Sequence, residues 1–384
     1  MNEKRTQFDR QTDRQTDRQT GHRNTNLELF RIISMLFIVA HHYVVNSGMM
    51  DNMWEHPGAA NSLFFFVFGA WGKVAINCFV LITGYFMCKS HITVKKFLKL
   101  FLQIETYNIV FYFVFMFSGY ESFSVSGFLK HILIVKNIDS GFVSAFIVFF
   151  LFIPFLNILL NHLNEKMHIR LILLCLFLYT FLSTMSYFSF SVKMNYVSWF
   201  VVVYFIASYV RLYPRRLYEN TKIWAVLSIV SIVFSIISIL GSLRFIWRDP
   251  YYFIADSNKI LAIVTAFCLF MFFKNVKIPY IKLINVVASA SFGVLLIHAN
   301  SDVMRQWLWR DTLNNAAVFK TQWCYLHFVC SVIGIYVICT CIDLLRIYLL
   351  EKPFFKLYDK VSSGIYARLY SIEDRFTKRM NIKR

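Results

Sequence analysis

The chain has 384 residues, of which 58% are hydrophobic and only 16% are charged. A soluble domain carries about 25% charged residues, so the composition excludes an ordinary soluble protein and predicts a helical membrane protein. The net charge of +19 does not by itself indicate a nucleic-acid partner, because basic residues also set the orientation of membrane helices.

The N-terminal segment is polar and repetitive. Residues 9–20 read Asp-Arg-Gln-Thr three times over. Such a tract cannot build a core, so residues 1–26 are predicted to be a disordered cytoplasmic tail. The codons GAC-AGA-CAG-ACA would be the unit GACA read through three frames, which predicts a slipping DNA tract and phase variation. The alternative is a solvated tail duplicated by chance, which mixed synonymous codons would support.

Apolar segments follow along most of the remaining chain, and most are long enough to cross a bilayer as a helix. We expect about ten, at residues 27–46, 62–88, 97–118, 141–160, 169–190, 196–212, 223–243, 259–273, 284–300 and 324–350. The eighth is short and is also compatible with a hairpin that only dips into the membrane. The predicted fold class is all-α: a polytopic transmembrane bundle over 27–350, followed by a basic cytoplasmic tail at 351–384.

The distribution of charge predicts the topology. Lys and Arg number 28 in residues 1–26, 89–99, 161–170, 211–222, 274–282 and 351–384, but 8 in residues 47–61, 119–140, 186–195, 244–258 and 301–322. Basic loops stay in the cytoplasm, so both termini are expected there. The expected partners are then the lipid bilayer and an anionic ligand at the inner loops, with no nucleic acid. A cleavable signal peptide is not expected, because the first apolar run begins too far in and is too long.

Motifs for metal or nucleotide chemistry are missing from the sequence. The eight Cys lie in or beside apolar segments without a CxxC pair, as expected of small packing residues in a reduced state. There is no HExxH, no Gly-rich phosphate loop and no GxSxG. We therefore expect no metal and no bound cofactor.

The first apolar segment contains Arg31 and His42, eleven residues apart. In a helix the two side chains lie on nearly the same face, about 16 Å apart along the axis. Charged or titratable residues in a membrane helix are costly and face a protein interior or a wet cavity. This spacing predicts an Arg near one end of a cavity and an imidazole near the other. The alternative is structural: the Arg side chain reaches the membrane interface, and the His caps the end of the helix.

Four segments resemble a known family. Residues 27–43, LELFRIISMLFIVAHHY, resemble the first-helix signature of the membrane-bound acyltransferase 3 family, an Arg, ten residues, then a His. NCFVLITGYF, ASFGVLLIHANS and RIYLLEKPFFKL resemble three later segments of that family, in the same order, at 77–86, 290–301 and 346–357. Thr83 stands where Ser is common, and Leu295 where an aromatic residue is usual. The resemblance covers about residues 27–357.

The resemblance implies an O-acyltransferase of the bacterial inner membrane. Such proteins move an acyl group, usually acetyl, from cytoplasmic acyl-CoA to a hydroxyl of a cell-surface polysaccharide or lipopolysaccharide. His42 matches the catalytic His and Arg31 its partner Arg. An imidazole, with an unperturbed pKa of about 6.5, can accept the proton of a sugar hydroxyl or be acylated itself, and both routes stay open. Arg31 would suit the phosphates or amide carbonyls of acetyl-CoA.

Other polar residues are weaker candidates. His41, Glu105 and His298 are candidates for catalytic support, although an ion pair with Arg31 or Lys73 explains Glu105 and an interior hydrogen bond explains His298. Donor-binding candidates are Lys73, Lys96 and Lys99, the last two standing where the family often has Arg-x-x-Arg. A role in topology alone is equally compatible with them.

Acceptor binding has the least specific signal. Polar residues in the second segment or near the predicted outer loops are the candidates, because few polar groups lie close to His42. These are Asn77, Tyr85, Asp256, Asn258, Asp302 and Arg305.

Two other functions are compatible with the composition. A glycan or lipid transporter or flippase would also place charged residues along a membrane path, although the two halves of this chain show no repeat of the kind many transporters have. An acyltransferase acting on a lipid or peptide is the other. The acceptor sugar, the acyl chain and the oligomeric state are not determined by the sequence.

Overall fold

The computed structural model describes residues 24–133, 141–185, 194–245 and 249–362. The repeat at residues 9–20 and most of the predicted C-terminal tail lie outside the described residues. Within them the chain is helical and contains no strand. The predicted all-α class is therefore confirmed.

The longer helices match the predicted apolar segments closely. They are α2 (Thr25–Val45), α4 (Ala60–Met87), α5 (Val94–Phe117), α7 (Phe142–His162), α8 (Glu165–Leu176), α10 (Tyr196–Leu212), α11 (Thr221–Phe245), α12 (Ile260–Asn275), α13 (Lys282–Ser289), α14 (Ser291–His298) and α17 (Cys324–Arg346). Short elements connect them: α3 (Met49–Glu55), α6 (Val125–Ile132), η1 (Phe177–Phe181), α9 (Leu182–Thr184), η2 (Arg216–Glu219), α15 (Asp302–Arg305), η3 (Gln306–Thr312), α16 (Asn315–Val318) and η4 (Ile347–Glu351).

Fewer helices than the ten predicted spans are both long and apolar enough to cross a membrane. Seven helices in the described residues are long and apolar enough to cross a membrane, or up to eight if a helix pair bent by 93° counts as one span. Helices α10 and α12 are apolar but shorter. The chain is thus a multi-pass membrane protein, while the count of ten and the side of the termini stay predictions.

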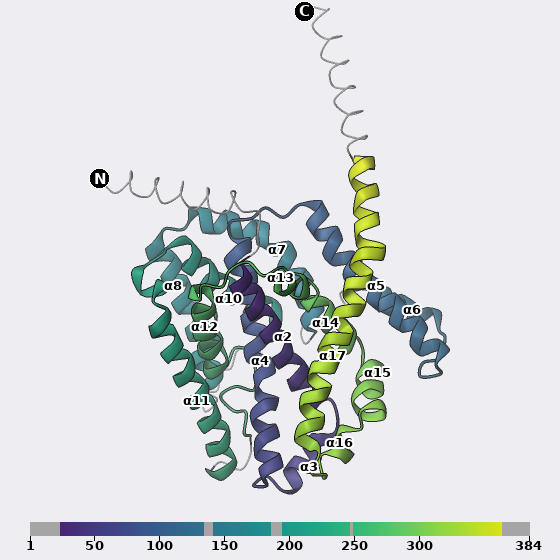
Figure 1. Ribbon diagram of the computed structural model, residues 1–384. Helices are drawn as coiled ribbons and strands as arrows, with labels where there is room; N and C mark the ends of the chain where they lie inside the picture. The colour runs from purple at the N-terminus through teal and green to yellow at the C-terminus, as the bar shows by residue number, and fades with distance from the viewer. Residues whose placement is uncertain (1–23, 134–140, 186–193, 246–248, 363–384) are drawn as a thin grey trace, which may run out of the picture.

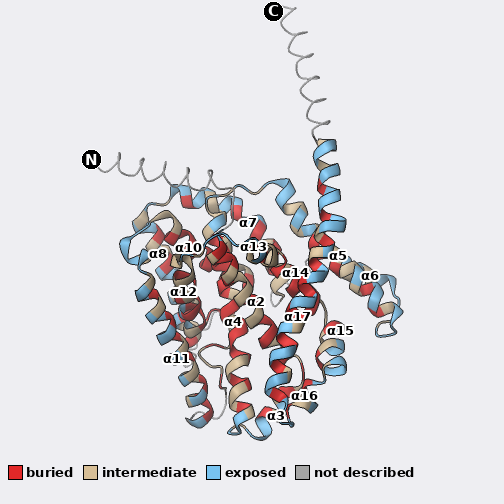
Figure 2. Cartoon of the chain, in the orientation of Figure 1, coloured by how far each residue is buried: buried red, intermediate tan, exposed pale blue. Residues whose placement is uncertain are grey.

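The bundle is built around two central helices, α2 and α4 (Figure 1). Helices α8, α10, α11 and α12 lie on one side of this pair, and α5, α14 and α17 lie on the other. Burial is concentrated on α2, α4 and α10 (Figure 2). Outer helices expose large apolar side chains, such as Val226, Ile229 and Phe234 on α11, as expected of a surface that faces lipid.

Both described ends of the chain emerge at the same end of the bundle (Figure 1). We call this the terminal face; it holds the start of α2 and the end of the C-terminal helix. The opposite end, with α3 and α16, is the distal end. Because α2 runs from the terminal face to the distal end, Arg31 lies nearer the terminal face and His42 nearer the distal end.

A sharp turn follows α14. The helix ends at His298, and Ser301 adopts an extended conformation and caps α15 by accepting a hydrogen bond from the Met304 N–H at 3.2 Å. The chain bends by 93° between the α13–α14 segment and the segment from Asp302 to Val318. The bend lies at the end of the predicted segment 284–300, and the chain after it returns toward His298.

Close packing between α14 and α17 depends on a glycine. A Cβ added at Gly293 would overlap the carboxyl group of Asp343, which is fully buried on α17. Gly334 offers a matched contrast on the same helix pair, because a Cβ there meets nothing within 4 Å.

Gly293→Ala should lower the stability of the protein by about 1–3 kcal/mol, because an overpacked contact forces the helices apart. Gly334→Ala should leave stability unchanged or raise it by about 1 kcal/mol through helix propensity. Thermal unfolding of the two variants in detergent measures the difference. Equal melting temperatures would contradict the close contact at Gly293.

Candidate active site

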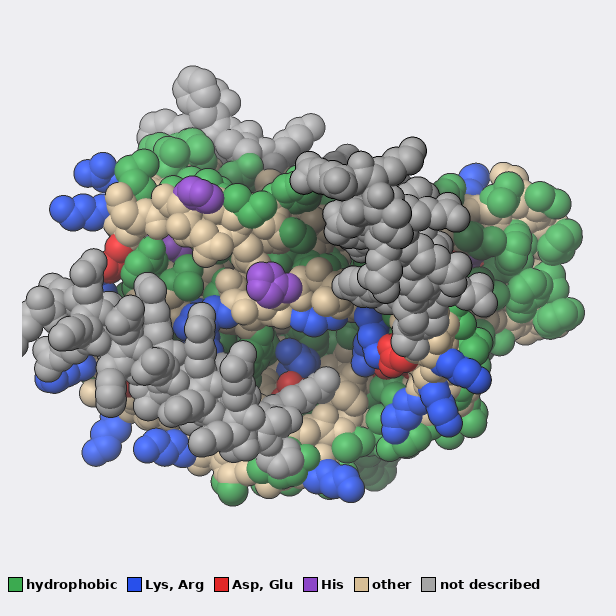
Figure 3. Space-filling model, turned by 90° about the horizontal axis from the view of Figure 1, so that it is seen from above, with side chains coloured by type: hydrophobic (Ala, Val, Ile, Leu, Met, Phe, Trp, Pro, Cys, Tyr) green, Lys and Arg blue, Asp and Glu red, His purple; other side chains and the backbone are tan. Residues whose placement is uncertain are grey.

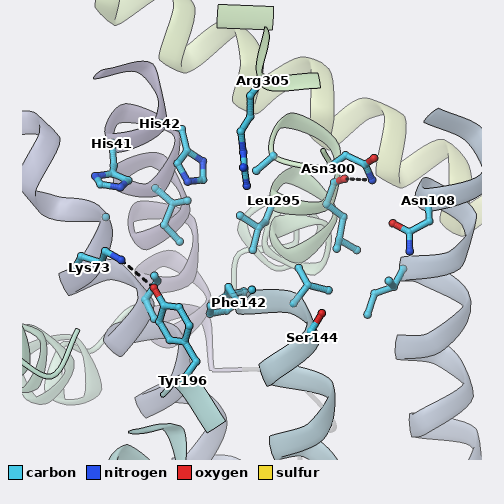
Figure 4. A pocket seen from close by; sticks show the side chains of 18 residues that line it. His41, His42, Lys73, Asn108, Phe142, Ser144, Tyr196, Leu295, Asn300 and Arg305 are labelled. Carbon is cyan, nitrogen blue, oxygen red and sulfur yellow. Dashed lines mark hydrogen bonds between the residues drawn. The ribbon is translucent and has the colours of Figure 1, made fainter. Parts of the chain in front are cut away.

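A cavity of about 300 Å³ lies inside the bundle next to His42. Helices α2, α4, α5, α7, α10, α14 and α15 all contribute to its wall. Figure 4 shows the polar side chains that face it. They are His41, His42, Lys73, Asn108, Ser144, Tyr196, Asn300 and Arg305.

The key contact in the cavity wall joins two imidazoles from distant parts of the chain. His42 Nδ1 lies 2.9 Å from His298 Nε2, and His298 Nδ1 lies 2.6 Å from the Val294 carbonyl oxygen. A carbonyl oxygen can only accept, so His298 carries its proton on Nδ1. With both rings uncharged, His298 Nε2 accepts from His42 Nδ1–H. The remaining nitrogen of His42, Nε2, then carries a lone pair.

The local fold holds His298 in this position. Val294 precedes His298 by one turn of α14, so the hydrogen bond fixes the ring against its own helix. Trp309, buried on η3 after the sharp turn, stands edge-on to the His298 ring with centroids 6.2 Å apart. His298 itself is fully buried. The ring has little freedom to rotate, and it fixes the tautomer of His42.

His41 faces the same cavity from a different angle. Its Nδ1 hydrogen-bonds to the Gly69 carbonyl of α4. A Cβ on Gly72, one turn later, would overlap the His41 ring. The two glycines, Gly69 and Gly72, therefore let α4 approach α2 closely enough to hold the His41 ring. His41 lines the same cavity as His42.

Positive charge lines the cavity at its distal end. Lys73 Nζ donates to Tyr196 Oη at 2.9 Å and lies 3.5 Å from Asp256 Oδ1. Arg305 points from α15 toward His42 (Figure 4). No carboxylate is among the described residues that line the cavity.

Arg31 does not line this cavity. It forms an ion pair with Glu28 one turn earlier on α2, at 2.9 Å. The lining of the cavity on α2 extends from His42 back to Ile38. Of the two residues that we expected at the ends of one cavity, His42 lines it. Arg31 lies two helical turns beyond Ile38, toward the terminal face, and is not part of the lining.

The donor-binding candidates are divided between the two ends. Lys73 lies beside His42 near the distal end, away from the others. Lys96 Nζ donates to the His91 carbonyl at 2.8 Å, and Lys99 Nζ forms an ion pair with Glu351 at 2.6 Å. Both are at the start of α5, at the terminal face, where the surface carries many Lys and Arg side chains around a recess (Figure 3). Lys73 is thus separated from the other two donor candidates, because α4 runs opposite to α2, and its role in donor binding stays a prediction.

Three acceptor candidates do not reach the cavity. Asn77 is fully buried and joins Trp199 to the Ser257 carbonyl. Asn258 is also fully buried and donates to the Tyr179 carbonyl at 2.7 Å. Tyr85 lies at the end of α4 near the terminal face, where its hydroxyl accepts from Arg211 at 3.0 Å. Their polar groups join helices in this structure, and their role as acceptor contacts stays a prediction.

The other candidates lie nearer to the cavity. Arg305 lines it, and Asp302, almost fully exposed, forms an ion pair with Arg305 at 2.6 Å. Asp256 reaches it only through Lys73. Glu105 is buried on α5 next to Ile104, which lines the wall. Its pairing with Arg31 or Lys73 stays a prediction.

A buried polar cluster near the terminal face was not predicted from the sequence. Arg346 Nε donates to Asp343 at 2.7 Å, and its Nη1 donates to Glu351 at 2.9 Å. Tyr107 and Gln103 of α5 also donate to Asp343, and Lys99 pairs with Glu351. The signal was present, since Asp343 and Arg346 are charged residues three apart in an apolar run. The cluster joins α5 to α17 and holds Lys99 in place.

A comparison with protein families gives one match that covers most of the chain. The model of an acyltransferase domain, acyltransferase 3, matches residues 24–344. The chain belongs to the acyltransferase 3 family. It is therefore a membrane acyltransferase, and the matched region includes His42, His298 and the whole described lining of the cavity. Searches of curated proteins and of solved structures gave no match.

Groups that could hold a metal ion were not found among the described residues. Two buried carboxylates of the acyltransferase fold, Asp343 and Glu351, are held by Arg346 instead. Asp343→Asn should therefore lower stability by about 3–5 kcal/mol, because it removes one member of a buried ion pair.

Asp359→Asn is the matched control. Asp359 pairs with Lys95 at 2.7 Å, but both side chains are about half exposed, so its loss should cost about 0–1 kcal/mol. Thermal unfolding in detergent compares the two variants. If Asp343→Asn unfolds at the same temperature as Asp359→Asn, the cluster does not stabilise the bundle.

Proposed function

We propose that this membrane acyltransferase is an O-acetyltransferase that moves an acetyl group from cytoplasmic acetyl-CoA to a hydroxyl of a cell-surface polysaccharide or lipopolysaccharide. The observation that supports it most is the pair His42–His298 in the wall of an internal cavity. A lone pair on His42 Nε2, with Nδ1–H held by a fixed acceptor, is the arrangement that a general base needs. The glycan acceptor and the acetyl donor rest on the resemblance of the sequence motifs.

The proposed reaction uses His42 twice. Its Nε2 accepts the proton of the acceptor hydroxyl, and the oxygen attacks the thioester carbonyl carbon. The tetrahedral intermediate then expels the thiolate of CoA, which takes the proton back from His42. The products are an O-acetyl ester and CoA. In the alternative route Nε2 attacks the thioester first and carries the acetyl group, and the same lone pair serves both routes.

Acetyl-CoA would approach from the terminal face. Arg31 lies about 16 Å along α2 from His42, on the side of the terminal face, whose surface carries many Lys and Arg side chains (Figure 3). Arg31, together with Lys96 and Lys99 at the start of α5, would attract the phosphates of CoA, while the thioester reaches His42. Lys99 would have to share its charge with Glu351.

We also propose the setting in which the protein works. The terminal face would lie in the cytoplasm of a bacterium and the distal end would face outward across the inner membrane. The repeat at residues 9–20 would make expression phase-variable, as expected for a modification of the cell surface. The codons of the repeat test this last point, because mixed synonymous codons would exclude slippage of a four-base unit.

His42→Ala should reduce acetyl transfer by about 10²–10⁴-fold, since the base is lost. The assay uses the purified protein in proteoliposomes, acetyl-CoA labelled in the acetyl group, and surface glycan from a strain that lacks the gene. Arg31→Ala should mainly raise the KM for acetyl-CoA. His162→Ala is the control, because His162 is exposed at the end of α7 and bonds only to its own helix.

Full transfer by the His42→Ala variant would exclude His42 as the reacting group. Absence of label from the glycan with active protein in the membrane would favour the transporter or a lipid or peptide acceptor.

His298 should act as a positioning residue. His298→Leu removes the acceptor for His42 Nδ1–H, so kcat should fall while the KM for acetyl-CoA stays unchanged. His298→Gln places a carbonyl oxygen in the same region and should restore part of kcat. The same transfer assay measures both variants. Equal loss in the Leu and Gln variants, together with a lower melting temperature, would indicate that His298 only stabilises the fold.

A further inference from the structure

Two cations near His42 are not explained by acyl transfer itself. Lys73 and Arg305 face the cavity, and no carboxylate is among the described lining residues. Asp256 and Asp302 contact these cations from outside the cavity. Cations that face a cavity with low-dielectric walls attract anions.

Arg305 is the better placed of the two for a ligand. Its ion pair with Asp302 is exposed to solvent on the carboxylate side, which is 94% exposed, and such pairs are weak. Its Nε is buried and has no hydrogen-bond partner in the part of the chain that the structure describes. The side chain points into the cavity toward His42 (Figure 4).

The fold fixes Arg305 at this position. Ser301 caps the short helix α15 immediately after the sharp turn. Trp309, four residues after Arg305, is fully buried against Tyr43 and His298. The segment that carries Arg305 is therefore anchored to the same imidazole that holds His42.

The donor does not account for this charge. Its phosphates are expected near Arg31, about 16 Å from His42 along α2. The part of the donor that reaches His42 is the neutral thioester. A cation beside His42 at the distal end therefore suits the other substrate, which enters from that end.

We propose that the acceptor is an acidic sugar, whose carboxylate or phosphate binds Arg305 while a neighbouring hydroxyl reaches His42 Nε2. This rests on the proposed function, because it assigns the distal end of the cavity to the acceptor. A guanidinium binds a carboxylate or phosphate through two parallel hydrogen bonds. Lys73, held by Tyr196 and Asp256, adds charge on the other side of His42.

The test measures binding without acyl transfer. The full-length protein in nanodiscs is mixed with methyl glucuronide, glucose 6-phosphate and methyl glucoside, and saturation-transfer NMR gives the affinity of each. We expect at least one of the two charged sugars to bind about tenfold or more tightly than the neutral glucoside. Whether the carboxylate or the phosphate binds better identifies the acidic group.

Variants assign the preference to Arg305. Arg305→Gln should remove it while leaving the weak signal of the glucoside unchanged, and Arg305→Lys should keep part of it. Arg310→Gln is the control, because Arg310 is exposed on the same segment and does not line the cavity. Melting temperatures check that each variant is folded.

Equal binding of charged and neutral sugars, or binding of none, would overturn the proposal. So would a preference that survives Arg305→Gln. These results are independent of the transferase assay. A charged sugar that binds through Arg305 while His42→Ala still transfers acetyl would refute the catalytic proposal and leave the acidic acceptor standing.

Discussion

The hydrogen bond between His42 and His298 is the constraint on which the rest of the site depends. Because His298 is tied to the Val294 carbonyl, its uncharged ring offers a lone pair to His42, and the uncharged ring of His42 then carries its own lone pair on the other nitrogen. The bend after α14 and the buried Trp309 hold His298 near His42, and the close approach of α4 at Gly72 fixes the neighbouring His41. His298 is fully buried, so water does not compete for its side of this hydrogen bond.

The two ends of the bundle have different electrostatic roles. At the terminal face the charged groups are compensated by one another, as in the cluster of Asp343, Arg346 and Glu351. Around the cavity the carboxylates stand outside while the cations face inward. The first arrangement stabilises the bundle, and the second supports the proposal that an anionic group of the acceptor binds in the cavity.

The sequence predicted the fold class, the helices and the place of His42, because apolar runs and an eleven-residue spacing are local signals. It could not predict the partner of His42, which lies 256 residues away. Nor could it predict that Tyr85 and Lys73 lie at different depths in the bundle, since depth depends on where α4 enters and leaves. Asn77 and Asn258 looked like ligand contacts because a polar residue near an apolar segment gives the same pattern whether it binds a substrate or joins two helices.

The most direct test of acyl transfer at His42 is proton NMR of the surface glycan from three otherwise identical strains, with the gene intact, deleted, or carrying His42→Ala at the same protein level. We expect an O-acetyl signal in the first strain only, with the shifted ring protons marking the acceptor position. A full O-acetyl signal in the His42→Ala strain would contradict the role of His42, and unchanged acyl groups in the deletion strain would contradict glycan acylation altogether.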